Sequence, residues 1–107
     1  MFGQIFKWLQ GTPSANSLSG KDFKAKFLET NNAVMIDVRT KNEYNSGSIK
    51  GAKNIDFFSS SFGSEIKKLD KNKTYFVYCA SGNRSGKACK MMESLGYQAY
   101  NLIGGVG

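Results

Sequence analysis

The sequence predicts an α/β fold in which helices flank a mainly parallel central sheet. Two short, continuous apolar runs, 33–36 and 74–78, have the composition of strands that are buried on both faces. Segments with apolar residues at helical spacing alternate with such runs along the chain, as in parallel α/β proteins. With 107 residues, 40% of them hydrophobic, and a single proline, the chain is sized for one domain with its own core.

Residues 1–17 are expected to form an N-terminal extension, and residues 18–107 the domain. Apolar side chains recur at helical spacing over residues 2–9, which predicts a short amphipathic helix docked on the domain or on a partner. Residues 11–17 are small and polar, as in a linker.

The first helix of the domain is expected to begin at Ser19, with Asp22 three residues later as the capping-box partner. Its buried stripe is predicted to consist of Phe23, Phe27 and Leu28. Asn31 and Asn32 end it, and the strand over 33–36 follows.

That strand ends in the polar sequence Asp37-Val38-Arg39. Thr40 and Glu43 then form a capping-box pattern that opens a short helix, and Gly47 closes it. A turn and a short strand follow over 49–55.

The third helix is expected to run through the lysine-rich 67–73 region, with a stripe of Phe62, Ile66 and Leu69. After the strand at 74–78, a helix is predicted over 84–95, and the last strand over 98–102. The inward residues of the 84–95 helix are predicted to be Ala88, Cys89, Met92 and Leu95, and Gly96 ends it.

The net charge of +7 comes almost entirely from lysines spread along the chain, because Arg39 and Arg84 are the only arginines. Nucleic-acid-binding proteins usually cluster their basic residues, so we expect no nucleic-acid partner and a positive field that attracts small anions. No apolar run approaches the roughly 20 residues of a membrane span. The stretch from Met1 to Gly11 lacks the charge order of a signal peptide.

Two cysteines are too few for a disulfide framework. If Cys79 precedes a helix containing Cys89, the helical rise of ~1.5 Å per residue separates their backbones beyond the ~7 Å limit of a disulfide. We therefore expect free thiols in a reducing, cytoplasmic compartment. The chain has no histidine, which excludes Cys-His catalysis, Ser-His-Asp triads and most zinc sites. No metal or organic cofactor is predicted.

Cys79 lies at the carboxyl end of a predicted strand, where ligands bind in open α/β sheets. The loop that follows leads into a helix N-terminus, whose unpaired N–H groups favour negative charge and should lower the thiol pKa. Gly82 lets the loop curl, Arg84 adds a fork of donors, and Ser85 adds a hydroxyl. The predicted anion-binding loop comprises Ala80, Ser81, Gly82, Asn83, Arg84 and Ser85.

A thiolate in such a cradle suits two chemistries. One is attack on sulfur, which gives a Cys79 persulfide, and the other is attack on phosphorus, which gives a phosphocysteine.

Several spaced motifs resemble, in order, the signatures of a rhodanese domain. They are Asp37-Val38-Arg39, Glu43-Tyr44, the segment 47–55, the segment 78–85, Gly96-Tyr97 and the segment 102–106. The similarity covers residues 18–107. It implies the rhodanese-like three-layer α/β fold and sulfurtransferase activity, with Cys79 as the sulfur carrier and the loop to Arg84 as the anion cradle.

The length of the loop separates the two chemistries within this resemblance. Arg84 follows Cys79 by five residues, whereas the cysteine-dependent phosphatases place arginine six residues after the cysteine, and position 85 here is serine. The shorter loop is similar to that of sulfurtransferases.

Three further residues are given supporting roles. Asp37 and Arg39 are expected to make structural hydrogen bonds and a salt bridge that support the loop, and Glu43 is expected to act as a helix cap.

The sequence thus predicts a sulfurtransferase that works by double displacement. A small anionic donor such as thiosulfate, or a persulfide, would pass sulfur to Cys79 and then to a thiol, protein or cyanide acceptor. The alternative hypothesis is a non-catalytic module of the same fold that senses persulfide or binds a protein. A cysteine-dependent phosphatase is the third hypothesis.

Overall fold

The computed structural model describes residues 16–107, and the predicted helix over 2–9 lies outside the described residues. Five parallel strands form one sheet in the order β1-β5-β4-β2-β3. The strands are β1 (Ser17–Leu18), β2 (Ala33–Asp37), β3 (Lys53–Asn54), β4 (Thr74–Tyr78) and β5 (Gln98–Leu102). The helices are α2 (Gly20–Glu29), α3 (Lys41–Asn45), α4 (Phe62–Lys67) and α5 (Asn83–Ser94). The predicted α/β fold with a parallel sheet is confirmed.

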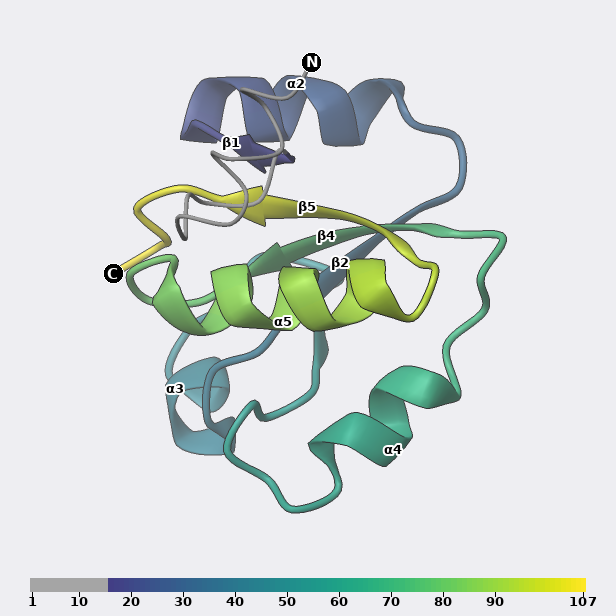
Figure 1. Ribbon diagram of the computed structural model, residues 1–107. Helices are drawn as coiled ribbons and strands as arrows, with labels where there is room; N and C mark the ends of the chain where they lie inside the picture. The colour runs from purple at the N-terminus through teal and green to yellow at the C-terminus, as the bar shows by residue number, and fades with distance from the viewer. Residues whose placement is uncertain (1–15) are drawn as a thin grey trace, which may run out of the picture.

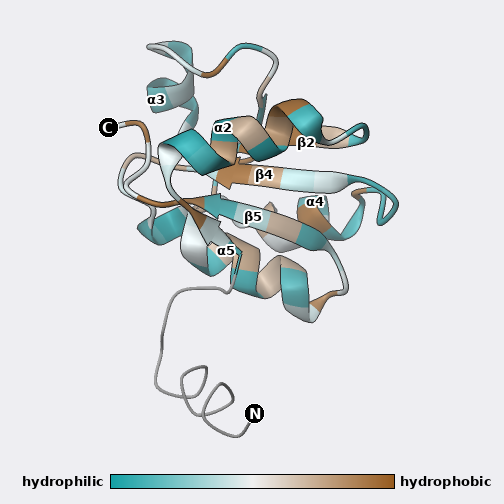
Figure 2. Ribbon diagram, turned by 90° about the horizontal axis from the view of Figure 1, so that it is seen from above, coloured by the Kyte–Doolittle hydropathy of each residue, from teal (hydrophilic) through white to brown (hydrophobic). Residues whose placement is uncertain are grey.

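Helices cover both faces of the sheet, with α2 on one side and α4 and α5 on the other (Figure 1). Strand β4 lies at the centre, and its side chains alternate between the two layers. Tyr75 and Val77 pack with α4 and α5, whereas Phe76 and Tyr78 pack on the side of α2. This two-sided burial explains the apolar and aromatic sequence of β4, which in Figure 2 is brown toward its arrowhead and pale at its start. The same alternation points Cys79, the next residue, toward α5.

Ser19 caps helix α2 as expected, since its hydroxyl accepts a hydrogen bond from Asp22 N–H at 3.4 Å, but among the described residues the Asp22 side chain makes no return bond to Ser19 N–H, so only half of the predicted capping box forms. Phe23 and Phe27 meet the ring of Phe76 edge-on. The prediction that Leu28 is buried is wrong, because its side chain is 72% exposed. Five residues of a helix turn through about 500°, so Leu28 lies about 140° from Phe23, away from the sheet.

Two other boundaries differ from the sequence-based prediction. Ser17, assigned to the linker, belongs to β1 and pairs with Asn101 of β5. Helix α4 ends at Lys67 and does not run through 67–73. The hydroxyl of Tyr97 contacts the carbonyl of Ile66, in the last turn of α4, at 2.7 Å and that of Leu69, just past the end of the helix, at 2.9 Å. A long-range contact thus satisfies carbonyls that a longer helix would have paired.

None of the helices in the described part of the chain is long and apolar enough to cross a membrane.

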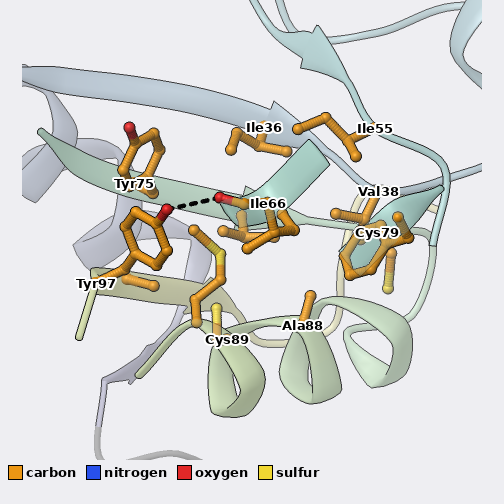
Figure 3. Packing of buried hydrophobic residues seen from close by; sticks show 13 residues of the cluster. Ile36, Val38, Ile55, Ile66, Tyr75, Cys79, Ala88, Cys89 and Tyr97 are labelled. Atoms are coloured by element: carbon orange, nitrogen blue, oxygen red, sulfur yellow. Dashed lines mark hydrogen bonds between the residues drawn. The ribbon is translucent and has the colours of Figure 1, made fainter. Parts of the chain in front are cut away.

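The buried hydroxyl of Tyr97 is expected to stabilise the fold (Figure 3). Tyr97→Phe keeps the ring but removes the one hydroxyl proton that the two carbonyls share, so we expect the free energy of unfolding to fall by about 1–2 kcal/mol. The matched control is Tyr100→Phe, whose hydroxyl makes only an exposed hydrogen bond with Gln98. Urea unfolding measures both, and equal losses would contradict a structural role for the Tyr97 hydroxyl.

Candidate active site

Cys79 follows β4 at the carboxyl edge of the sheet, and its side chain is fully buried. Its sulfur accepts hydrogen bonds from Gly82 N–H at 3.0 Å, Ser85 N–H at 3.4 Å and the Ser85 hydroxyl at 3.3 Å. The loop can curl around the sulfur because Gly82 adopts φ 95°, a left-handed conformation that favours glycine. Helix α5 begins at the next residue, so its N-terminal turn faces the sulfur. These contacts surround the sulfur of Cys79 with hydrogen-bond donors, at the place where the sequence predicts an anion cradle.

The surroundings of the two cysteines shift their pKa values in opposite directions. Burial raises the pKa of Cys79, but the hydrogen bonds from Ser85, Ser81 and Gly82 outweigh it, so the pKa lies below its ordinary value. Burial, together with the negative charges of Glu93 and Cys79, raises the pKa of Cys89. Both thiols are free. Only Cys79 is therefore surrounded by groups that stabilise a thiolate.

The remaining loop residues do not all face the sulfur with their side chains. Ser81 and Asn83 are exposed, and the Ser81 hydroxyl accepts a hydrogen bond from Asn83 N–H at 3.3 Å. Ala80 contributes its carbonyl, which accepts a hydrogen bond from Gly107 N–H at 2.8 Å. The cradle is therefore built from backbone N–H groups and the hydroxyl of Ser85.

Arg84 lies beside the cradle, and its guanidinium is paired with Glu43 of α3. Its two terminal nitrogens donate to the two carboxylate oxygens at 2.8 and 3.0 Å, a bidentate arrangement. The hydrogen bonds from Arg84 are the main reason that the pKa of Glu43 is lowered to about 2. The guanidinium also lies 5.5 Å from the centre of the Phe58 ring.

Glu43 also completes the predicted capping box of α3. The backbone N–H and the hydroxyl of Thr40 both donate to Glu43 Oε1 at 3.0 Å, and Glu43 N–H donates to the Thr40 hydroxyl. Sequence reasoning found this cap but missed the pair with Arg84. The adjacency of β2 and β4 brings α3 and α5 together, and only the order of the strands could have indicated it.

Asp37 and Arg39 form the expected salt bridge, at 2.8 Å. Arg39 also donates to the carbonyl of Gly47 and lies over the ring of Tyr78, the residue before Cys79. Asp37 is fully buried, and Arg39 is 8% exposed. The pair holds the turn after α3 and the end of β4, and no contact with the sulfur of Cys79 is seen among the described residues.

The segment 103–107 passes against the cysteine loop. Val106 N–H donates to the carbonyl of Cys79 at 3.0 Å, next to the Gly107 bond described above. Gly105 has φ 63°, and a Cβ at this position would overlap the backbone of Cys79 and Ala80. The close approach of this segment to the loop therefore requires glycine at position 105.

A pocket of about 400 Å³ borders the loop on another side, between α5 and β5. Its lining includes Gly82, Lys87, Lys90 and Asn101 but not Cys79. No group of three or more histidine, cysteine or acidic residues that could hold a metal ion occurs within residues 16–107.

Two alanine substitutions distinguish the effect of the close contact between Gly105 and the loop from the effect of its positive φ. Gly104→Ala and Gly105→Ala both place alanine at positive φ, which costs about 1–2 kcal/mol, but only position 105 meets backbone atoms within van der Waals distance. We expect Gly105→Ala to lose clearly more stability in urea unfolding and to change the alkylation rate of Cys79. Equal effects of the two substitutions would contradict this role.

Comparisons with known proteins agree with this architecture. The family model described as a rhodanese-like domain matches residues 19–107. The putative sulfurtransferase YtwF of Bacillus subtilis is 32% identical over 89 residues, which cover 83% of this chain and 84% of that protein. The thiosulfate sulfurtransferase PspE of Escherichia coli is 34% identical over 77 residues, which cover 66% of this chain and 68% of that protein.

A solved structure shares the fold. The crystal structure of a rhodanese-like domain protein from Staphylococcus aureus is similar with a TM-score of 0.73 at 33% identity, covering 84% of this chain and 86% of that one. The family match spans strands β2 to β5, the cysteine loop and the segment after β5. The chain therefore belongs to the rhodanese-like domain family.

Proposed function

We propose that this protein is a sulfurtransferase in which Cys79 carries sulfane sulfur as a persulfide. The observation that carries the proposal is the cradle around the Cys79 sulfur, with donors from Gly82 and Ser85 at 3.0–3.4 Å. These groups lower the pKa of the thiol despite its burial. A thiolate that is already formed needs no general base, which fits a chain without histidine.

The first half-reaction loads the cysteine. With thiosulfate as donor, the Cys79 thiolate attacks the outer sulfur, a new sulfur–sulfur bond forms, and the donor's own sulfur–sulfur bond breaks. The electron pair of that bond leaves with sulfite. Negative charge then resides on the outer sulfur of the persulfide, where the N–H groups at the start of α5 stabilise it.

The second half-reaction returns the enzyme to its starting state. An acceptor thiolate, or cyanide in an assay, attacks the outer sulfur of the persulfide, and the Cys79 thiolate leaves. A thiosulfate-like donor is supported by the name of the relative PspE, and a thiol or protein acceptor follows from the same chemistry. The cradle needs no metal or organic cofactor for either step.

The free state of both cysteines supports a reducing, cytoplasmic location. The alternative function is a module that senses persulfide or binds a protein without turnover, and a phosphatase is the third possibility. Asp37 and Arg39 are assigned a positioning role, because they hold the end of β4 through Tyr78.

Incubation with thiosulfate followed by intact mass measurement tests the proposal. We expect a gain of one sulfur atom, its loss on addition of cyanide, and its absence in Cys79→Ser. Cys89→Ala is the matched control, since Cys89 packs in the core, and it should keep the adduct.

Three outcomes would contradict the proposal. An adduct that persists in Cys79→Ser would place the sulfur elsewhere. Hydrolysis of an aryl phosphate without any sulfur adduct would favour the phosphatase. A stable adduct that no acceptor removes would instead support the sensing module.

A further inference from the structure

Arg84 is the cation that is expected to bind the oxygens of a sulfur donor. Its guanidinium is already paired with a carboxylate of the protein. Both terminal nitrogens bind the carboxylate of Glu43, at 2.8 and 3.0 Å. The carboxylate is itself held in place, because Thr40 donates two hydrogen bonds to Glu43 Oε1. Glu43 is thus a fixed anion in the position that an oxyanion of a donor would take.

A tethered carboxylate changes the charge that a donor meets. With the Cys79 thiolate formed, Glu43 and Arg84 cancel each other and the site keeps one negative charge. Thiosulfate carries two negative charges and must displace Glu43 or approach it closely. The persulfide group of an organic donor carries only one negative charge, and transfer of its outer sulfur requires only the cradle at Cys79.

The surroundings of Arg84 also offer an apolar contact. The Phe58 side chain is 69% exposed, and its ring lies beneath the guanidinium. The exposed ring therefore offers an apolar surface directly beside the guanidinium. The carbon part of an organic donor can lie on Phe58, whereas thiosulfate has no such part.

We propose that Glu43 is a specificity-determining residue that disfavours thiosulfate and favours organic persulfides. The observation that carries this inference is the bidentate Glu43–Arg84 pair beside the exposed ring of Phe58. This inference rests on the proposed sulfurtransferase function and selects between its two donor classes. In the favoured step, the Cys79 thiolate bonds to the outer sulfur of R–S–S⁻. The sulfur–sulfur bond of the donor breaks, and its electron pair leaves on the inner sulfur as the thiolate R–S⁻.

The substitution Glu43→Gln tests the role of the charge. Glutamine also serves in capping boxes, so α3 keeps its first turn while the negative charge is removed. Glu29→Gln is the matched control, because it removes the same charge at the end of α2, just before β2 begins and at the opposite edge of the sheet from Cys79. Initial rates of Cys79 sulfuration would be measured against thiosulfate and against cysteine persulfide, at low ionic strength.

We expect Glu43→Gln to lower the KM for thiosulfate about tenfold, as removal of one charge next to a dianion implies. The KM for cysteine persulfide and both kcat values should stay within about twofold. Phe58→Ala should raise the KM for cysteine persulfide and leave the KM for thiosulfate unchanged. Glu29→Gln should change neither KM value.

Other results would overturn the inference. If Glu43→Gln shifts the KM for both donors alike, or raises that for thiosulfate, Glu43 does not discriminate by charge, while the proposed function stands. If Phe58→Ala leaves both KM values unchanged, the apolar contact is excluded. If neither donor loads Cys79 of the wild-type protein, the proposed function fails and this inference fails with it.

Discussion

The hydrogen bonds donated to the sulfur of Cys79 are the interaction on which the candidate site depends. The donors belong to Gly82 and Ser85, which stand at the start of α5. Without them, burial alone would raise the thiol pKa and leave a core cysteine like Cys89. The difference between the two cysteines is therefore a difference in donors, because both side chains are fully buried.

The fold places these donors through three features. Strand β4 alternates its side chains between two covered faces, so that Cys79 points toward α5 (Figure 3). Gly82 turns the chain back over the sulfur. The segment 103–107 fixes the start of the loop, because the N–H groups of Val106 and Gly107 donate to the carbonyls of Cys79 and Ala80. The charged side chains around the loop form two ion pairs, Glu43 with Arg84 and Asp37 with Arg39. In the proposed reaction, the Glu43–Arg84 pair favours organic persulfides over thiosulfate. The Asp37–Arg39 pair holds the end of β4.

Sequence patterns that are local in the chain predicted the structure well. The bounds of β4 and β5, the cap at Ser19 and the capping box of α3 depend on neighbouring residues, and all of them are confirmed. The cradle at Cys79 was predictable for the same reason, since strand, loop and helix follow one another directly.

The features that sequence reasoning missed depend on contacts between distant segments. Strand β1 is too short to have a pattern of its own and exists because Ser17 and Leu18 pair with β5. Tyr97 binds the carbonyls at the end of α4, 28 and 31 residues away in the chain. Glu43 and Arg84 are 41 residues apart, and their pairing follows from the order of the strands. Leu28 was misplaced because apolar character alone does not specify the side of a helix.

Donors at the start of α5 are expected to lower the pKa of Cys79 below that of an ordinary cysteine despite its burial. Titration of thiolate absorbance in the wild-type protein, Cys79→Ser, Ser85→Ala and the control Ser94→Ala tests this expectation most directly. Stabilising the thiolate lowers the pKa, so the wild-type protein should show one ionisation below the ordinary cysteine range that Cys79→Ser abolishes. Ser85→Ala should shift it to higher pH, and Ser94→Ala, whose hydroxyl binds only the carbonyl of Met91, should not. An ionisation of Cys79 at or above that of a free cysteine, or one that Ser85→Ala leaves unchanged, would contradict the account.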